Sequence, residues 1–317
     1  AKYAALCKSE AAHQKIISNS LGWLDMPRLM PARLDEIEAF TEEILGSGFE
    51  HAVVLGMGGS SLAPEVFRRS FPRKEGYPAL HVLDSTDPEA VASIEAAAPP
   101  RRTLYLLASK SGSTVEPNRM LDYFYAKAGP RAGERFAAVT DPDSPLTRTA
   151  AELGFRRIFL NYADIGGRYS ALSLFGLLPA ALAGVEVSAL LERAARMAEA
   201  CAAEPENNPG WNLGIQLAEL ARRGRDKLTI LAAPEIASLG LWLEQLIAES
   251  TGKEGIGVVP ISGEGDLDFG EYRADRVFVG LSLASSADKG LAERLDALEA
   301  NGRPVIRIEL NDALDLG

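Results

Sequence analysis

Two glycine- and serine-rich stretches have the residue types of an anion-binding site. The first, GMGGSS, begins at Gly56 directly after an apolar run and precedes a segment with helical character. A strand, a glycine turn and a helix place unpaired backbone N–H groups and the positive end of a helix dipole at one spot, which favours phosphate or carboxylate. A tight turn whose glycines serve only packing would look the same, so both interpretations stay open.

The second stretch, LLASKSGSTVEP at 106–117, is richer in hydrogen-bond donors. After an apolar run it places hydroxyl groups and one ammonium together, on Ser109, Lys110, Ser111, Ser113 and Thr114. Hydroxyl and backbone N–H groups can surround the terminal oxygens of a phosphate with directional bonds, and a lysine offsets the charge. An ordinary helix cap needs only one such hydroxyl. The stretch therefore indicates a phosphate site.

Neither stretch has the spacing of a nucleotide-binding loop. Gly56, Gly58 and Ser61 leave the third glycine of G-x-G-x-x-G unfilled, and the pattern G-x-x-x-x-G-K-[ST] is absent from the sequence. The sequence therefore disfavours a nucleotide-dependent enzyme.

A third stretch places an arginine beside paired glycines. Gly166, Gly167 and Arg168 precede a long apolar segment. The glycines allow close backbone approach, and the permanently charged guanidinium suits an oxyanion. A surface arginine paired with Asp164 would have the same sequence, so that alternative stays open.

A fourth stretch, LGLWLEQLIAESTGKEG at 239–255, predicts an amphipathic helix with Glu249 in its last turn. A carboxylate there can accept and return a proton, which suits a general base. A solvated glutamate at a helix end is the alternative.

The elements that must position these residues follow a repeating pattern. Apolar segments alternate with helix-length stretches, which predicts a doubly wound parallel sheet with strands at 52–56, 79–84, 103–108, 135–139 and 156–160. A second set predicts another sheet with only three strands, which we expect to be incomplete, at 227–234, 276–283 and 304–310.

The same pattern predicts four segments. They are an N-terminal helical segment, a first sheet domain, a pair of bridging helices and a truncated second sheet domain, at 1–47, 48–185, 186–225 and 226–317. Because the chain begins at Ala1 and stops shortly after an apolar strand, we expect it to be a piece of a longer protein.

Composition limits the partners. The formal net charge of −11 disfavours nucleic acid and anionic membranes, which require a concentrated basic surface. No apolar run approaches the ~20 residues of a membrane span, and the N-terminus lacks a signal-peptide core, so we expect a cytoplasmic protein. Cys7 and Cys201 are far apart and lack metal-ligand spacing, which predicts reduced thiols and no metal site.

Taken in order, GMGGSSLAP, SKSGSTVE, GGRYSALSLFGLLPAALAG and EQLIAESTGKEG resemble the motif series of the phosphoglucose isomerase family. The resemblance covers about 200 residues, from Gly56 to Gly255. It implies an α/β protein with two sugar isomerase (SIS) domains, each a doubly wound parallel sheet in three α/β/α layers. LGWLDMP and PVIRIELNDALDLG further resemble the isomerase part of bacterial transaldolase/phosphoglucose isomerase fusions.

The resemblance implies reversible isomerisation of glucose 6-phosphate and fructose 6-phosphate through a cis-enediol(ate), without metal or organic cofactor. It also implies a homodimer and, in the native chain, an upstream transaldolase domain. The alternative function is a noncatalytic SIS module that binds a sugar phosphate. Glu249 distinguishes the two, because a binding module does not need a base at the sugar carbons.

The resemblance also assigns roles to individual residues. Glu249 would carry the proton between C1 and C2, and Arg168 would stabilise the developing enediolate. The remaining matches would bind the phosphate or the sugar, and they are Gly59, Ser60, Ser109, Lys110, Ser111, Thr114, Gly167 and Gln245.

Two departures from the family's pattern leave sugar ring opening unassigned. The family's ring-opening histidine lies some thirty residues after the glutamate, whereas the histidines here are His13, His51 and His81. The family's catalytic lysine lies on a C-terminal helix beyond the region represented in this sequence.

Overall fold

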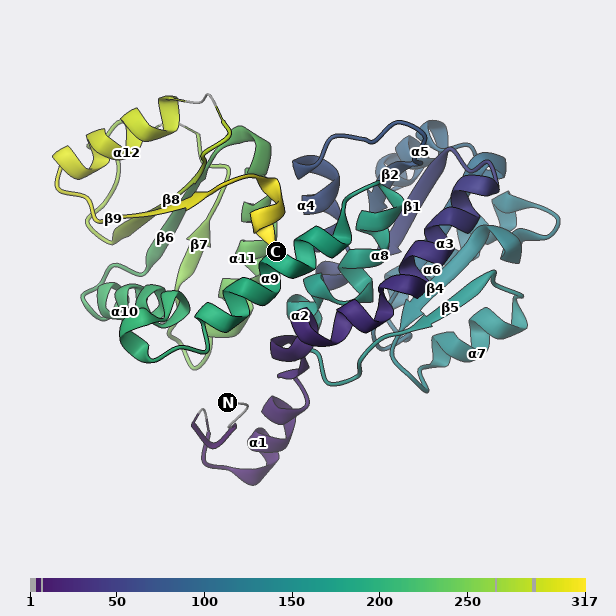
Figure 1. Cartoon of the computed structure of the whole chain (residues 1–317), viewed down its shortest axis with the longest axis horizontal. Coiled ribbons are helices and arrows are strands. Elements are labelled where there is room, and N and C mark those ends of the chain that lie inside the picture. Colours follow the sequence, from purple (N-terminus) through teal and green to yellow (C-terminus); the bar gives the residue numbers. More distant parts are fainter. Residues whose placement is uncertain (1–3, 7, 266, 287–288) are drawn as a thin grey trace. The chain divides into compact units, whose positions relative to one another are not determined.

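The computed structural model describes residues 4–6, 8–265, 267–286 and 289–317. The chain forms two compact units, Ala1–Leu191 and Glu192–Gly317, and the boundary falls within helix α9 (Val187–Ala200). Each unit has its own parallel sheet (Figure 1). The mixed α/β fold with two parallel sheets that the sequence predicts is confirmed.

The first unit contains a five-stranded sheet in the order β2-β1-β3-β4-β5, and all its strand pairs are parallel. The strands are β1 (His51–Gly56), β2 (Ala79–Leu83), β3 (Thr103–Ala108), β4 (Phe136–Thr140) and β5 (Arg157–Leu160). Gly56 pairs with Ala108, so β1 and β3 end side by side. Every residue of β3 and β4 is buried, as expected for central strands covered on both faces.

Helices cover both faces of this sheet. On one face, a core around Val53, Tyr105 and Phe136 packs against α5 (Pro88–Ala97), α6 (Val115–Ala128) and α7 (Pro145–Glu152). The Tyr105 and Phe136 rings stack at 4.8 Å between centroids. Helix α8 (Leu174–Leu182) packs against both α3 (Leu34–Gly46) and α4 (Leu62–Ser70), and it also contacts β1. All nine residues of α8 are buried, so it is a central helix with no solvent face.

Part of the N-terminal segment packs on the same unit. Helix α1 (Ala11–Ser18) has no buried residue, whereas α2 (Met26–Leu29), which follows after a break, contains the fully buried Met26. The Gly22 N–H donates to the Asp164 carbonyl at 2.7 Å, which attaches this segment to the loop after β5.

The second unit contains a four-stranded parallel sheet in the order β7-β6-β8-β9. The strands are β6 (Lys227–Ala232), β7 (Val259–Ile261), β8 (Arg276–Leu283) and β9 (Val305–Leu310). The prediction of only three strands is therefore wrong. The missed strand, β7, is three residues long, contains Pro260 and lies at the sheet edge, where a missing N–H is tolerated.

Helices pack on both faces of the second sheet as well. The core around Leu228, Val277 and Leu281 includes side chains from α10 (Pro209–Arg222) and α11 (Leu239–Thr251). A smaller core around Phe278 includes Leu295 and Leu298 of α12 (Gly290–Ala300).

Within the described residues, no helix has both the length and the apolar character needed to cross a membrane. In the same part of the chain, no three metal-binding side chains gather into a ligand set. Cys201 is an exposed free thiol, and Cys7 lies outside the described residues.

Two histidines contact each other across the first sheet. His51 Nδ1 lies 3.1 Å from His81 Nε2, so one ring nitrogen must be unprotonated to accept the hydrogen bond. Burial is the main cause that lowers the pKa of both rings below 6.5. Positive charge on His51 lowers the pKa of His81, and Arg73 lowers both pKa values further. Glu50 acts in the opposite direction and raises the pKa of His51.

We therefore expect acid to weaken the fold through this pair. Since the folded pKa values lie below the unfolded value of 6.5, the unfolded chain binds more protons between the two. The free energy of unfolding must then fall as the pH drops through 6.5, and this contribution is fully present above it. Urea unfolding at pH 7.5 and 5.5 measures the change in the free energy of unfolding between the two pH values. This change should be smaller in the double variant His51→Gln/His81→Gln than in the wild type. An equal pH dependence in the wild type and the variant would contradict this account.

Candidate active site

The candidate site lies at the point where the first sheet reverses its winding. Because β2 and β3 flank β1 on opposite sides, the connections leaving β1 and β3 diverge. A crevice forms at the carboxyl ends of such strands, and ligands of open α/β sheets bind there. The GMGGSS turn follows β1, and the SKSGST loop follows β3.

A pocket of about 230 Å³ occupies this crevice. It brings together seven of the predicted binding residues, which are Gly59, Ser60, Ser109, Lys110, Ser111, Thr114 and Gly167. Met57, Ala108 and Pro117 complete the lining. The arrangement places hydroxyl groups, one ammonium and glycine backbone around a small volume, which suits a phosphate group.

The loop after β3 has a defined local conformation. Gly112 has a φ of +66°, and a Cβ there would come within 2.7 Å of the Leu146 backbone nitrogen, so the position requires glycine. The Asn118 side-chain amide donates to the Thr114 carbonyl at 2.9 Å. The Ser113 hydroxyl and Ser111 hydroxyl lie 2.9 Å apart. These contacts hold the loop against the first turn of α6.

The first turn of α6 points toward the same pocket. Thr114 is the N-cap residue, but its hydroxyl makes no capping hydrogen bond. The Ser109 hydroxyl lies 3.5 Å from the Thr114 hydroxyl, a long contact that a better acceptor can replace. A phosphate here would meet both hydroxyls and the positive end of a 14-residue helix.

The GMGGSS turn and the glycine pair before α8 touch through backbone atoms. A Cβ built on Gly59 would lie 2.0 Å from the Gly167 carbonyl oxygen, so only glycine allows this approach. The Ser170 hydroxyl donates toward the Gly167 carbonyl at 2.7 Å and toward the Gly59 carbonyl at 3.3 Å. The two turns are therefore held together on one side of the pocket.

Arg168 is half-buried next to this turn but is not among the pocket-lining residues. Its guanidinium lies over the Tyr169 ring, 4.7 Å from the centroid. Tyr169 in turn stacks on Trp23 at 5.2 Å. The aromatic pair thus supports the arginine on one face.

Gln245 and Glu249 lie one turn apart on α11, in the second unit. The Gln245 side-chain amide donates to Glu249 Oε1 at 3.0 Å, which orients the exposed carboxylate. The Lys253 ammonium donates to the Glu249 carbonyl at 2.5 Å at the helix end. Neither Gln245 nor Glu249 lines the pocket at the end of β1 and β3.

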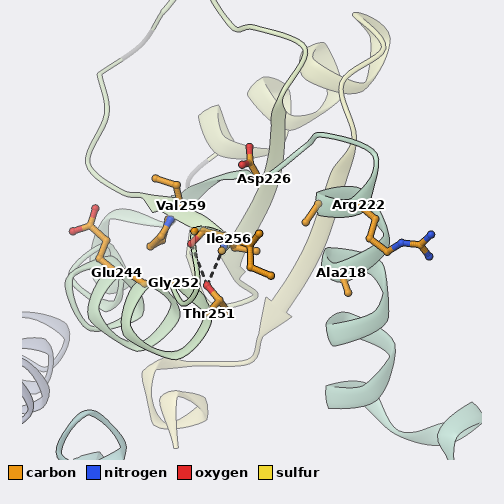
Figure 2. Close-up of a pocket in the computed structure, with 14 residues that line it drawn as sticks. Ala218, Arg222, Asp226, Glu244, Thr251, Gly252, Ile256 and Val259 are labelled. Atoms are coloured by element: carbon orange, nitrogen blue, oxygen red, sulfur yellow. Dashed lines mark hydrogen bonds between the residues drawn. The ribbon is translucent and has the colours of Figure 1, made fainter. Parts of the chain in front are cut away.

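A larger pocket of about 920 Å³ lies within the second unit, beside the last turn of α11 (Figure 2). Thr251 hydrogen-bonds to Val258 there and holds the loop that closes one side. The charged residues of its lining are Arg222, Asp226 and Glu244, and the Arg222 guanidinium extends away from the other labelled side chains. With two carboxylates and one hydroxyl, this pocket is poorly suited to phosphate.

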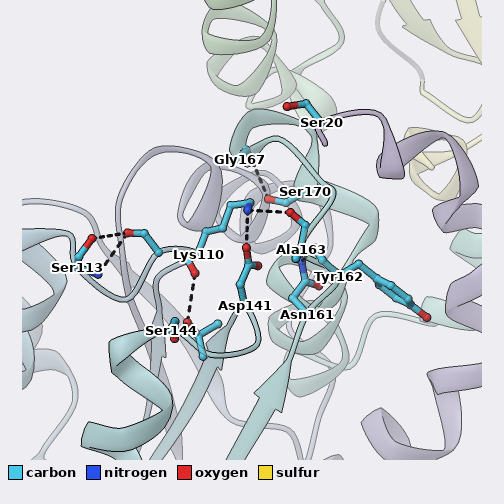
Figure 3. A network of polar contacts seen from close by, with 12 residues as sticks. Ser20, Lys110, Ser113, Asp141, Ser144, Asn161, Tyr162, Ala163, Gly167 and Ser170 are labelled. Carbon is cyan, nitrogen blue, oxygen red and sulfur yellow. Dashed lines mark hydrogen bonds and ion pairs between the residues drawn. The ribbon is translucent and has the colours of Figure 1, made fainter. Parts of the chain in front are cut away.

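Sequence reasoning missed Asp141, which follows β4 and forms an ion pair with Lys110 (Figure 3). TDPDSP has the composition of an ordinary turn. The available signal was position, because Asp141 directly follows the strand beside β3 and therefore lies at the same end of the sheet as the Ser109–Thr114 loop.

The sequence model of the phosphoglucose isomerase family matches residues 30–275, most of the chain. The chain belongs to this family. The prediction made from the four motifs is thereby confirmed. The matched range contains the pocket residues, Arg168, Gln245 and Glu249.

Curated relatives agree with this assignment. The glucose-6-phosphate isomerase of Carboxydothermus hydrogenoformans is 33% identical over an alignment of 257 residues, which covers 76% of this chain and 55% of that protein. The glucose-6-phosphate isomerase of Rubrobacter xylanophilus is 30% identical over an alignment of 273 residues, which covers 81% of this chain and 63% of that protein. The chain thus spans between about half and two thirds of the length of these phosphoglucose isomerases.

Solved structures share the fold. A hypothetical protein of Thermus thermophilus matches with a TM-score of 0.82 and 27% identity, over 93% of this chain and 80% of that one. The glucose-6-phosphate isomerase of Chlamydia trachomatis matches with a TM-score of 0.68 and 19% identity, over 94% of this chain and 62% of that one. The tagatose-6-phosphate ketose/aldose isomerase of Escherichia coli matches with a TM-score of 0.64 and 12% identity, over 98% of this chain and 84% of that one.

The backbone contact between Gly59 and Gly167 yields a stability prediction. Gly59→Ala should lower the free energy of unfolding by about 1–3 kcal/mol, because the new methyl group overlaps the Gly167 backbone and forces the turns apart. Gly46→Ala is the matched control, since a Cβ at that helix end meets nothing within 4 Å. Urea unfolding of both variants measures the difference. If Gly59→Ala had the same free energy of unfolding as the wild type, the two turns would not be in contact.

Proposed function

We propose that this chain interconverts glucose 6-phosphate and fructose 6-phosphate, as part of a phosphoglucose isomerase. The observation that carries the proposal is the pocket at the carboxyl ends of β1 and β3, where seven residues matching the family's motifs line one small volume. That pocket lies inside the range matched by the family's sequence model, together with Glu249. The names of the curated relatives support the choice of substrate.

In this proposal the pocket binds the phosphate of the sugar. The hydroxyls of Ser109, Ser111 and Thr114 donate to its oxygens, and Lys110 offsets its charge. The phosphate is remote from the reacting carbons, so its binding energy orients the sugar and lowers the entropic part of the barrier. Gly59, Ser60 and Gly167 provide backbone close enough to contact the sugar, and Gln245 contacts the substrate from α11.

Proton transfer is assigned to Glu249. Moving the carbonyl from C1 to C2 requires removal of a proton next to a carbonyl and its return to the neighbouring carbon, so one carboxylate serves both half-reactions. The intermediate is a cis-enediol(ate), whose oxygens gather negative charge. Arg168 stabilises that charge without reorganising during the reaction, because its side chain is already supported by the Tyr169 ring.

The proposal needs neither metal nor organic cofactor, and it leaves ring opening unassigned. His51 and His81 are bonded to each other on the first sheet, and His13 pairs with Glu10 in the N-terminal segment. The cytoplasmic location, the homodimer and the upstream transaldolase domain stay predictions from the sequence.

Isomerisation by this chain and its dependence on Glu249 test the proposal. Glu249→Gln should lower kcat by about 10²–10⁴-fold, since the amide keeps the shape but cannot carry a proton. Exchange of deuterium at C2 of the substrate should disappear with it, whereas the affinity for 6-phosphogluconate should change little. A coupled assay measures kcat, NMR measures the exchange at C2, and calorimetry measures the affinity for 6-phosphogluconate.

Glu244→Gln, on the same helix, is the matched control. Its side chain accepts a hydrogen bond from the Ser262 N–H at 3.0 Å, which an amide oxygen can also accept, so activity should persist. Phosphosugar binding without isomerisation or C2 exchange in the wild type would favour the noncatalytic SIS module. Persistent exchange in pure Glu249→Gln would assign the base to another residue.

A further inference from the structure

The Lys110 ammonium is engaged by groups that the motif does not contain. Its Nζ forms an ion pair with Asp141 Oδ2, and it donates to the Ala163 carbonyl at 3.1 Å (Figure 3). A second bond joins the same pair, because the Asp141 backbone N–H donates to the Lys110 carbonyl at 3.1 Å. Lys110 and Asp141 are therefore held together through both main chain and side chain.

This ammonium connects three consecutive loops at one edge of the sheet. Lys110 follows β3, Asp141 follows β4 and Ala163 follows β5. Ala163 is four residues before Gly167, so the contact also anchors the segment that leads to the glycine turn of the pocket. An ammonium has three N–H donors in a tetrahedral arrangement. When two are directed at Asp141 and Ala163, the direction of the third is determined.

Asp141 is unusual for a surface ion pair. Its side chain is only 13% exposed, and its Oδ1 is buried without a hydrogen-bond partner among the described residues. Burial raises the pKa of Asp141, and the neighbouring Asp164 adds to this effect, while Lys110 opposes it. A buried carboxylate oxygen that lacks a partner opposes folding, so stability alone does not account for this residue.

We propose that Asp141 is a positioning residue that holds the Lys110 ammonium so that its third N–H points at a phosphate bound by Ser109, Ser111 and Thr114. The proposal rests on the phosphosugar function proposed above. It opposes a simpler electrostatic account, in which Asp141 only offsets the charge of Lys110. That account requires binding of an anionic sugar to become tighter when the carboxylate is neutralised.

A double-mutant cycle separates these accounts. The dissociation constant of 6-phosphogluconate is measured by calorimetry for the wild type, Asp141→Asn, Lys110→Met and the double variant. We expect each single variant to bind about tenfold more weakly. The double variant should bind no more weakly than Lys110→Met, because Asp141 acts through the ammonium. Asp122→Asn is the control, since Asp122 makes an exposed ion pair with Arg119 on α6 and should bind as the wild type does.

Asp141→Glu tests position without changing charge. One extra methylene displaces the carboxylate, so this variant should also weaken binding although the ion pair's charges are kept. If circular dichroism shows that Asp141→Asn does not fold, Asp141→Glu replaces it in the cycle. Unchanged or tighter binding in the folded Asp141 variants would overturn the proposal, as would an Asp141 effect that persists undiminished beside Lys110→Met. Absence of 6-phosphogluconate binding in the wild type would instead contradict the proposed function.

Discussion

The site depends on one constraint, which is that a parallel sheet covered on both faces can present polar groups only where its strands end. Every residue of β3 is buried, so the first available donors are those of Ser109 and the loop that follows. At a formal net charge of −11, the chain as a whole repels anions. Attraction for a phosphate must therefore be local, from hydroxyls, one ammonium and the N-terminus of α6.

Local attraction is effective only if the loops that provide it are held in place. Two links do this in the first unit. On one side, Gly59 and Gly167 are in backbone contact, and the Ser170 hydroxyl bonds both turns. On the other, Lys110 joins the loops after β3, β4 and β5. A site whose loops are already ordered loses little conformational entropy when a ligand binds, so more of the contact energy remains as affinity.

Local pattern was sufficient to predict the sheets and most of the pocket. Strand β3 occupies the predicted residues 103–108, and β4 is displaced by one residue from the predicted 135–139. Both were predictable because short apolar runs between helix-length segments indicate buried strands. The loop residues from Ser109 to Thr114 were visible because their composition exceeds what a helix cap requires. Two features were not visible. The strand at Val259–Ile261 is too short and contains a proline, and the pairing of Asp141 with Lys110 joins residues 31 positions apart through sheet topology that composition does not encode.

A crystal structure of the chain with 6-phosphogluconate tests the central claim most directly. The account predicts that the phosphate lies at the carboxyl ends of β1 and β3, within hydrogen-bonding distance of the Ser109, Ser111 and Thr114 hydroxyls and of the Lys110 ammonium. A phosphate bound elsewhere, for example in the pocket beside Thr251, with the crevice between β1 and β3 empty, would contradict it.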